Sequence, residues 1–131
     1  ELGVRFARFV TPEVDRIAGA ELGAIALAAA TSLQTGKPFV IVRNAKKTGY
    51  GTGKLIEGRL ERGERVLLVE DVCTSGGQAI EACRTIEAAG GTVTGIVVTI
   101  DRQEGGREAI EQAGYRFAAL FTTADLGVKK E

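Results

Sequence analysis

The run from Val66 to Gln78 joins four apolar residues, two adjacent carboxylates and a short loop of Thr, Ser and Gly. The apolar residues are typical of a buried strand, and residues 79–86 have the apolar spacing of an amphipathic helix. Backbone N–H groups of a glycine-containing turn converge on a phosphate, and the positive end of the helix dipole favours its charge. The carboxylates of Glu70 and Asp71 suit ribose hydroxyls, or Mg²⁺ held through water. The run therefore predicts a site for a sugar phosphate.

This loop differs from two better-known phosphate loops. A Walker loop requires Gly-Lys followed by Ser or Thr, whereas Gly53 and Lys54 are followed by Leu55. The dinucleotide-binding fingerprint requires G-x-G-x-x-G directly after a strand, and residues 74–77 do not supply it. The alternative interpretation is a doubly wound domain in which a strand ends in acids beside a helix start by coincidence.

Composition narrows the class of protein. The 131 residues suit one domain spanning 1–131. The formal net charge is +0, so no global field favours nucleic acid, and no apolar run reaches the length of a membrane span. Histidine is absent, which excludes catalytic triads and imidazole metal sites, and we assign no metal-ligand set to the protein itself. The two cysteines, Cys73 and Cys83, indicate reduced thiols in a cytoplasmic protein rather than a disulfide scaffold.

Apolar periodicity predicts alternating helices and strands along the chain. The predicted helices cover residues 2–10, 22–33, 78–89 and 107–113, with Gly36 predicted as the C-cap of the second. The predicted strands cover residues 14–20, 38–42, 65–69, 92–100 and 115–122, with a short return strand at 55–58. This order predicts an α/β fold, a doubly wound and mostly parallel sheet with helices on both faces.

Four of the predicted strands are followed by residues that could bind a ligand. They are Glu21, Arg43, the pair Glu70 and Asp71, and Arg102 after Asp101. Ligands of doubly wound sheets bind at the carboxyl ends of the strands, so these residues are expected to lie around one site. Two simpler alternatives are a solvated Arg43 and an ordinary ion pair between Asp101 and Arg102.

Residues 43–54 form a basic, glycine-rich stretch with four cations, no acid and three alternating glycines. Like charges on a stretch of high backbone entropy disfavour a rigid resting structure. The composition predicts a mobile flap at about 44–56 that closes onto a polyanion, which cancels the repulsion and excludes water. The alternative is a solvated surface hairpin.

Together these segments resemble the orotate phosphoribosyltransferase family, a branch of the type I phosphoribosyltransferases. Residues 45–58 are similar to the catalytic flap of the family, and residues 69–77 match its signature for 5-phosphoribosyl 1-diphosphate (PRPP). Residues 101–107 are similar to the segment that holds the base, and residues 19–23 stand where the family has its pyrophosphate loop. The resemblance implies transfer of phosphoribosyl from PRPP to orotate, with Mg²⁺ required, giving orotidine 5′-monophosphate and pyrophosphate in pyrimidine (UMP) biosynthesis.

The resemblance also implies roles for individual residues in the pyrophosphate and base sites. Lys47 or Lys46, together with Arg43, would neutralise the departing pyrophosphate, and Arg102 would pair with the orotate carboxylate through its guanidinium fork. Backbone N–H groups would help at the pyrophosphate loop, at Glu21, Leu22 and Gly23. The flap serves the active site of the other subunit in this family, which implies a homodimer.

The ribose and its 5′-phosphate have their own implied contacts. Glu70 and Asp71 would hold the ribose hydroxyls and favour the positive charge that develops on the ring. The residues implied to bind around the 5′-phosphate are Val72, Cys73, Thr74, Ser75, Gly76, Gly77 and Gln78.

The chain departs from the family pattern in the flap and before its first residue. Tyr50 stands where family members commonly have histidine and keeps a hydroxyl for substrate binding, while Asn44 replaces a second flap lysine. The N-terminal hood that covers orotate has no counterpart before Glu1, so we expect either a truncated form or a base held more openly. Two other functions stay open: a regulator of the same fold that senses PRPP or nucleotides, and a phosphoribosyltransferase for another base.

Overall fold

The computed structural model describes residues 2–43 and 55–127. The elements in chain order are α1 (Leu2–Ala7), β1 (Arg16–Ala20), α2 (Ile25–Thr35), β2 (Phe39–Val42), β3 (Ile56–Glu57), β4 (Arg65–Cys73), α3 (Gly77–Ala88), β5 (Thr92–Asp101), α4 (Gly106–Gln112) and β6 (Phe117–Thr122). Gly36 has φ +77° and its N–H donates to the Ser32 carbonyl, so the predicted C-cap of α2 is confirmed.

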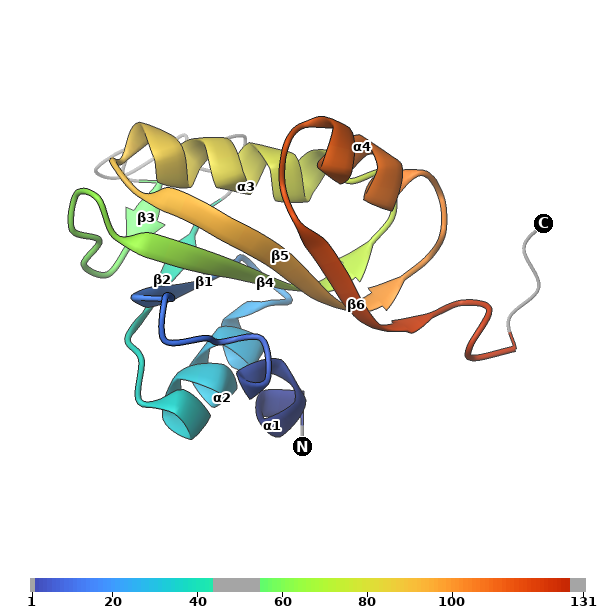
Figure 1. Cartoon of the computed structure of the whole chain (residues 1–131), viewed down its shortest axis with the longest axis horizontal. Helices are drawn as coiled ribbons and strands as arrows, with labels where there is room; N and C mark the ends of the chain where they lie inside the picture. The colour runs from blue at the N-terminus through green and yellow to red at the C-terminus, as the bar shows by residue number, and fades with distance from the viewer. Residues whose placement is uncertain (1, 44–54, 128–131) are drawn as a thin grey trace.

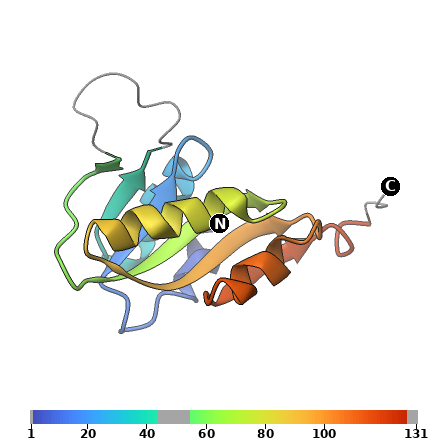
Figure 2. The ribbon, with the colours of Figure 1, turned by 90° about the horizontal axis from the view of Figure 1, so that it is seen from above.

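The strands form one sheet in the order β3-β2-β1-β4-β5-β6. Strands β2, β1, β4, β5 and β6 pair in parallel, and the short β3 runs antiparallel to β2 as the predicted return strand. Helices α1 and α2 cover one face and α3 and α4 the other (Figure 1). From above, α3 lies along the middle of the sheet with α4 beside it (Figure 2). The predicted doubly wound, mostly parallel fold is therefore confirmed, and the carboxyl ends of the parallel strands meet at one edge.

Alternating side chains of β4 divide the apolar core into two layers. Val66 and Leu68 face α3, and their cluster includes Ile86 of that helix. The neighbouring residues Leu67 and Val69 lie in the opposite cluster, which includes Phe6 of α1. Because successive strand residues point to opposite faces, a continuous apolar run fills both layers.

Two elements differ in length from their predicted ranges. Helix α1 ends at Ala7 rather than at residue 10, because Phe9 and Val10 donate N–H groups in tight turns to Phe6 and Ala7. Strand β4 continues to Cys73 rather than ending at residue 69, because the long β5 supplies ladder partners as far as Asp101. Glu70 and Asp71 therefore belong to the strand. Because successive residues of a strand point to opposite faces of the sheet, their side chains are expected to point in different directions.

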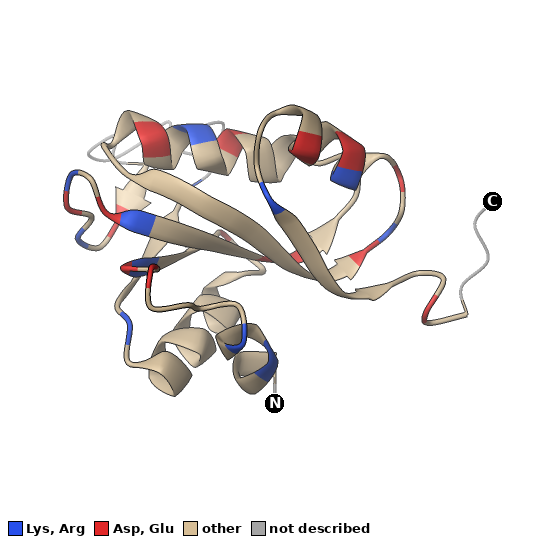
Figure 3. Ribbon diagram, viewed as in Figure 1, with Lys and Arg blue, Asp and Glu red and all other residues tan. Residues whose placement is uncertain are grey.

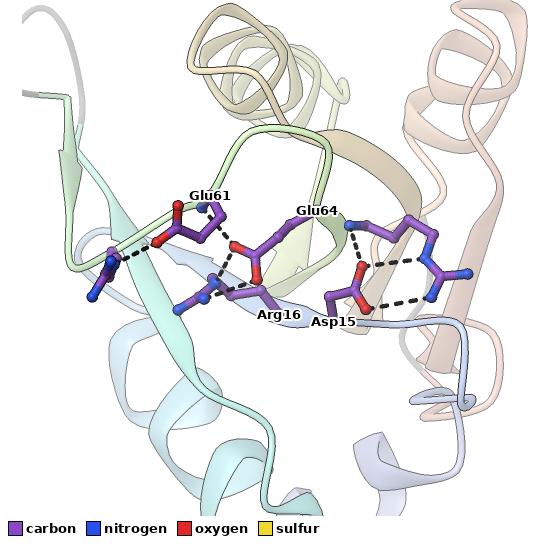
Figure 4. Close-up of polar contacts among 6 residues, drawn as sticks. Asp15, Arg16, Glu61 and Glu64 are labelled. Carbon is purple, nitrogen blue, oxygen red and sulfur yellow. Dashed lines mark hydrogen bonds and ion pairs between the residues drawn. The ribbon is translucent and has the colours of Figure 1, made fainter.

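Charged residues lie mainly in loops, at strand ends and on the helices, and most of the sheet carries none (Figure 3). At the amino ends of β1 and β4, Arg16 forms a two-pronged ion pair with Glu64, at 2.7 and 2.9 Å (Figure 4). Beside it, Arg65 binds Asp15 through its backbone N–H and its guanidinium. Hydrogen bonds from these arginines lower the pKa values of Glu64 and Asp15. The edge opposite the predicted site is therefore joined by ion pairs.

Among the helices described, none combines the length and apolar composition of a membrane crossing.

Replacing Arg16 with Ala should lower the free energy of unfolding by about 1–3 kcal/mol, because the mostly buried Glu64 carboxylate loses its positively charged partner and keeps only the N–H of Glu61 among the described residues. The side chains of this pair are 11% and 18% exposed. Urea unfolding followed by circular dichroism measures the change. The matched control is Arg59→Ala, since Arg59 pairs with Glu61 but is 84% exposed; it should change stability by less than about 0.5 kcal/mol. Equal small effects from both variants would contradict a structural role for the Arg16 pair.

Candidate active site

A cavity of about 280 Å³ lies at the carboxyl edge of the sheet, between the end of β4 and the start of α3. Its walls contain most of the residues predicted to bind the ribose and its phosphate: Glu70, Asp71, Val72, Cys73, Thr74, Ser75, Gly76 and Gln78. Ala79 and Val98 complete the lining. The structure thus brings together, in one hollow, residues that the sequence predicted to share a site.

Glu70 is a buried carboxylic acid in the wall of this cavity. Its side chain faces the α3 layer, opposite Val98 in the β4–β5 register, and the residue is only 6% exposed. Its Oε1 atom is buried and has no hydrogen-bond partner among the described residues. Burial, with a smaller contribution from neighbouring Asp71, raises the pKa of Glu70 to about 8. At pH 7 the group is therefore mainly a neutral carboxyl, which can both donate and accept a hydrogen bond.

Asp71 points in a different direction and joins β4 to the predicted pyrophosphate loop. Its Oδ1 accepts the N–H of Val72 at 2.8 Å. Its carboxylate also lies against Gly23, where a Cβ atom would come within 2.2 Å of Oδ2. A residue with a side chain at position 23 would displace this carboxylate, so the glycine allows the two segments to approach.

The loop after β4 ends in the first turn of α3. Gly76, with φ +88°, precedes the helix, and no side chain among the described residues caps it. Among the described residues, the amide of Gly77 has only a long contact, 3.5 Å, to the Ser75 hydroxyl. The first N–H groups of an α-helix have no partner within the helix and carry the positive end of its dipole. The end of α3 therefore suits an anion at the mouth of the cavity.

A smaller hollow of about 30 Å³ lies beside this cavity and shares Gln78 with it. Glu21 and Arg43 line it from the ends of β1 and β2. Arg43 pairs with Glu57 of β3 at 3.2 Å, and its contact with pyrophosphate stays a prediction. Leu22 is 80% exposed in the loop after β1. The predicted pyrophosphate-binding residues within the described ranges thus adjoin the predicted phosphate site.

Arg102 lies next to the phosphate loop, because its N–H donates to the Cys73 carbonyl at 2.9 Å. Its side chain is 55% exposed, and its guanidinium pairs with Glu104 at 3.2 Å, so the alternative of an ion pair with Asp101 is wrong. Asp101 is buried and accepts the N–H of Gln103 instead. A substrate carboxylate could therefore reach the Arg102 guanidinium by replacing Glu104.

The flap residues lie outside the described residues. Lys46, Lys47 and Tyr50 belong to this group, so their predicted roles, and the choice between the two lysines, stay predictions. Ile56, at the predicted end of the flap, already belongs to β3.

Three residues of this region were given no individual role from the sequence. Val98 could have been found by aligning β5 with β4, because it stands opposite Glu70. Ala79 follows Gln78 in the first turn of α3, and its methyl side chain has no polar or charged group that would mark it as a site residue. Gln103 has φ +60°, a left-handed conformation that its residue type does not indicate.

Both cysteines should resist a thiol reagent such as dithionitrobenzoate in the folded protein at pH 8. Cys73 and Cys83 are 4% and 0% exposed, and burial raises their pKa values to about 11 and about 12. The thiolate is the reactive form, so it is scarce as well as shielded. Unfolding in urea should expose both thiols and restore rapid reaction. Fast modification of either thiol without urea would contradict this burial.

Comparison with known proteins identifies the family to which the chain belongs. The profile of the phosphoribosyl transferase domain matches residues 11–114. The chain is 50% identical over 123 residues to an orotate phosphoribosyltransferase of Pyrococcus abyssi, covering 91% of this chain and 67% of that protein. It is 46% identical to another from Methanocella arvoryzae, covering 95% and 71%. The chain spans 62–67% of the length of three Pyrococcus and Thermococcus relatives that it matches.

Solved structures give the same assignment. The orotate phosphoribosyltransferase of Mycobacterium tuberculosis H37Rv, in complex with PRPP, has a TM-score of 0.81 and 34% identity, covering 97% of this chain and 74% of that chain. The Aeropyrum pernix orotate phosphoribosyltransferase has a TM-score of 0.82 and 28% identity, covering 96% and 75%. The matched domain and the identity to these relatives show that the chain belongs to the orotate phosphoribosyltransferase family of type I phosphoribosyltransferases.

Proposed function

We propose that this protein transfers phosphoribosyl from PRPP to orotate in the cytoplasm, releasing pyrophosphate and forming orotidine 5′-monophosphate for pyrimidine synthesis. The observation that carries the proposal is the cavity at the carboxyl edge, where the acidic end of β4 meets the uncapped start of α3. Its relatives are named orotate phosphoribosyltransferases, and one structural neighbour was solved with PRPP. The buried free cysteines agree with a reducing compartment.

The substrate is oriented by groups at the two ends of the cavity. The N–H groups at the start of α3 hold the 5′-phosphate, while Glu70 and Asp71 bind the ribose hydroxyls. Both groups favour the positive charge that develops on the ring, with Glu70 acting from the buried wall of the cavity and Asp71 from its exposed side. The two roles differ because Glu70 is buried whereas Asp71 is exposed.

The leaving pyrophosphate lies next to the loop after β1. Arg43 and the flap lysines neutralise its charge, and the close contact between Gly23 and Asp71 holds that loop beside the ribose. Neutralising a developing polyanion lowers the barrier most when the positive groups are already in position. In the proposed homodimer the flap reaches the site of the partner subunit.

Mg²⁺ fits this site as an ion that arrives with PRPP. Among the described residues, no cluster of three or more His, Cys, Asp or Glu side chains could hold a metal by itself. The pair Glu70 and Asp71 would hold the ion through water, and the remaining oxygens would come from the substrate. When bound, the ion would supply positive charge to the pyrophosphate.

The first test is consumption of orotate by the purified protein with PRPP and Mg²⁺, run beside uracil, adenine and hypoxanthine. Turnover of orotate alone would establish the reaction and the base together. Turnover of a different base would replace orotate in the proposal. Binding of PRPP without turnover of any base would favour a sensor of the same fold.

A further inference from the structure

The loop that carries Arg102 is fastened to the segment after β6. Gln103 adopts φ +60°, a conformation that costs free energy for a residue with a long side chain. Such a conformation persists only where surrounding contacts enforce it. The contacts of Gln103 therefore indicate what holds this loop in place.

Gln103 makes hydrogen bonds in two directions. Its backbone N–H donates to Oδ1 of the buried Asp101 at 2.9 Å. Its side-chain Oε1 accepts the Ala124 N–H and the Thr123 hydroxyl, each at 3.0 Å. The Thr123 N–H in turn donates to the Asp101 carbonyl at 3.1 Å. The ends of β5 and β6 are thus tied together through one glutamine side chain.

These bonds fix the backbone on both sides of the Arg102 side chain. Before it, the Arg102 N–H is bound to the Cys73 carbonyl of the phosphate loop. After it, the Thr123 hydroxyl lies 3.3 Å from the Arg102 carbonyl. The hydroxyl can donate either to this carbonyl or to the Gln103 amide oxygen. The Arg102 side chain is half exposed, and among the described residues Glu104 is the ion-pair partner of its guanidinium. The direction in which the guanidinium points before the substrate binds is therefore set by the backbone that the Gln103 hydrogen bonds hold in place.

We propose that Gln103 is a positioning residue, which fixes the strand-end loop so that the Arg102 guanidinium meets the carboxylate of the base substrate. The inference rests on the proposed function, because it assumes that Arg102 binds the base. It predicts an effect on the base and not on PRPP, since the Gln103 contacts lie between β5 and β6 rather than in the β4–α3 loop.

The test compares Gln103→Gly with a matched pair at position 123. Glycine adopts φ +60° without strain, so this variant removes the acceptor and leaves the backbone conformation accessible. Thr123→Val removes the hydroxyl donor at nearly constant shape, and Thr123→Ser restores it. We expect KM for orotate to rise about tenfold in Gln103→Gly and about threefold in Thr123→Val. KM for PRPP and the melting temperature should change little, and Thr123→Ser should resemble the parent.

Amide hydrogen exchange gives a readout that does not depend on turnover. The Ala124 N–H donates to Gln103 Oε1, so its exchange should be faster in Gln103→Gly and unchanged in Thr123→Ser. Suppose that the Ala124 N–H exchanges faster in Gln103→Gly while KM for orotate is unchanged, or while KM rises equally for orotate and PRPP. Either result would overturn the positioning role alone. Unchanged exchange would overturn the anchoring itself. Absence of orotate turnover in the unaltered protein would overturn the proposed function, and the role of Gln103 with it.

Discussion

Replacing Arg102 with Ala is expected to raise KM for orotate by about 10- to 100-fold while changing KM for PRPP by less than about threefold. A charge-assisted, two-pronged pair between a guanidinium and a carboxylate contributes about 1.5–3 kcal/mol, which corresponds to this range. Arg102 stands at the end of β5 with its backbone bound to the phosphate loop, so its loss removes a contact to the base and spares the β4–α3 cavity. Steady-state kinetics with each substrate varied in turn measures the two constants.

Two further variants separate the charge of Arg102 from its shape. Arg102→Lys keeps a positive charge but loses the planar fork, so an intermediate rise in KM for orotate is expected. The control is Arg116→Ala, because Arg116 is exposed and precedes β6 at the opposite edge of the sheet. This variant should leave both constants unchanged. Equal rises in KM for orotate and PRPP in Arg102→Ala would contradict a role for Arg102 in binding the base.

Most of the fold could be predicted from the sequence because its signals are local. Apolar periodicity located the helices and strands, and the alternation of the two predicted the doubly wound sheet. The extension of β4 to Cys73 could not be read in this way, since a strand continues for as long as a neighbour offers hydrogen bonds, and β5 does so up to Asp101. The apolar run that ends at Val69 marks where burial on both faces ends, not where the ladder ends.

The gathering of these residues at one edge of the sheet was predictable, but the contacts among them were not. Residues that follow parallel strands must meet at one edge, so Glu70, Asp71 and Arg102 could be grouped from topology alone. The sequence did not indicate that Glu70 faces the α3 layer while Asp71 lies against Gly23. Nor did it distinguish Glu104 from Asp101 as the partner of Arg102. Those outcomes depend on side-chain directions that follow from the exact register and the turn geometry.

The burial of Glu70 has a measurable consequence for stability. The pKa of this carboxyl group is about 8 in the folded protein, against an ordinary value of 4.5. The folded state thus binds the proton more tightly than the unfolded state does. The stabilising contribution is fully present below pH 4.5 and is lost as the pH rises to about 8. A shift of this size corresponds to about 3–5 kcal/mol once the group is ionised.

Replacing Glu70 with Gln should therefore make the protein more stable at pH 9, by about 3–5 kcal/mol, with a difference of less than about 1 kcal/mol at pH 5. Glutamine has nearly the same shape and stays neutral, so it removes the cost of burying a charge beside Asp71 without opening a cavity. Urea unfolding between pH 5 and 9 measures the two curves, and Glu81→Gln, at an exposed position on α3, is the control.

Because a carboxyl group with an unpartnered oxygen destabilises the folded state at high pH, the position of Glu70 in the cavity wall is better explained by ligand binding than by stability. The same variant should then weaken PRPP binding even where it stabilises the fold. Parallel stability curves for the parent and Glu70→Gln would show that the carboxyl group is not buried in this way.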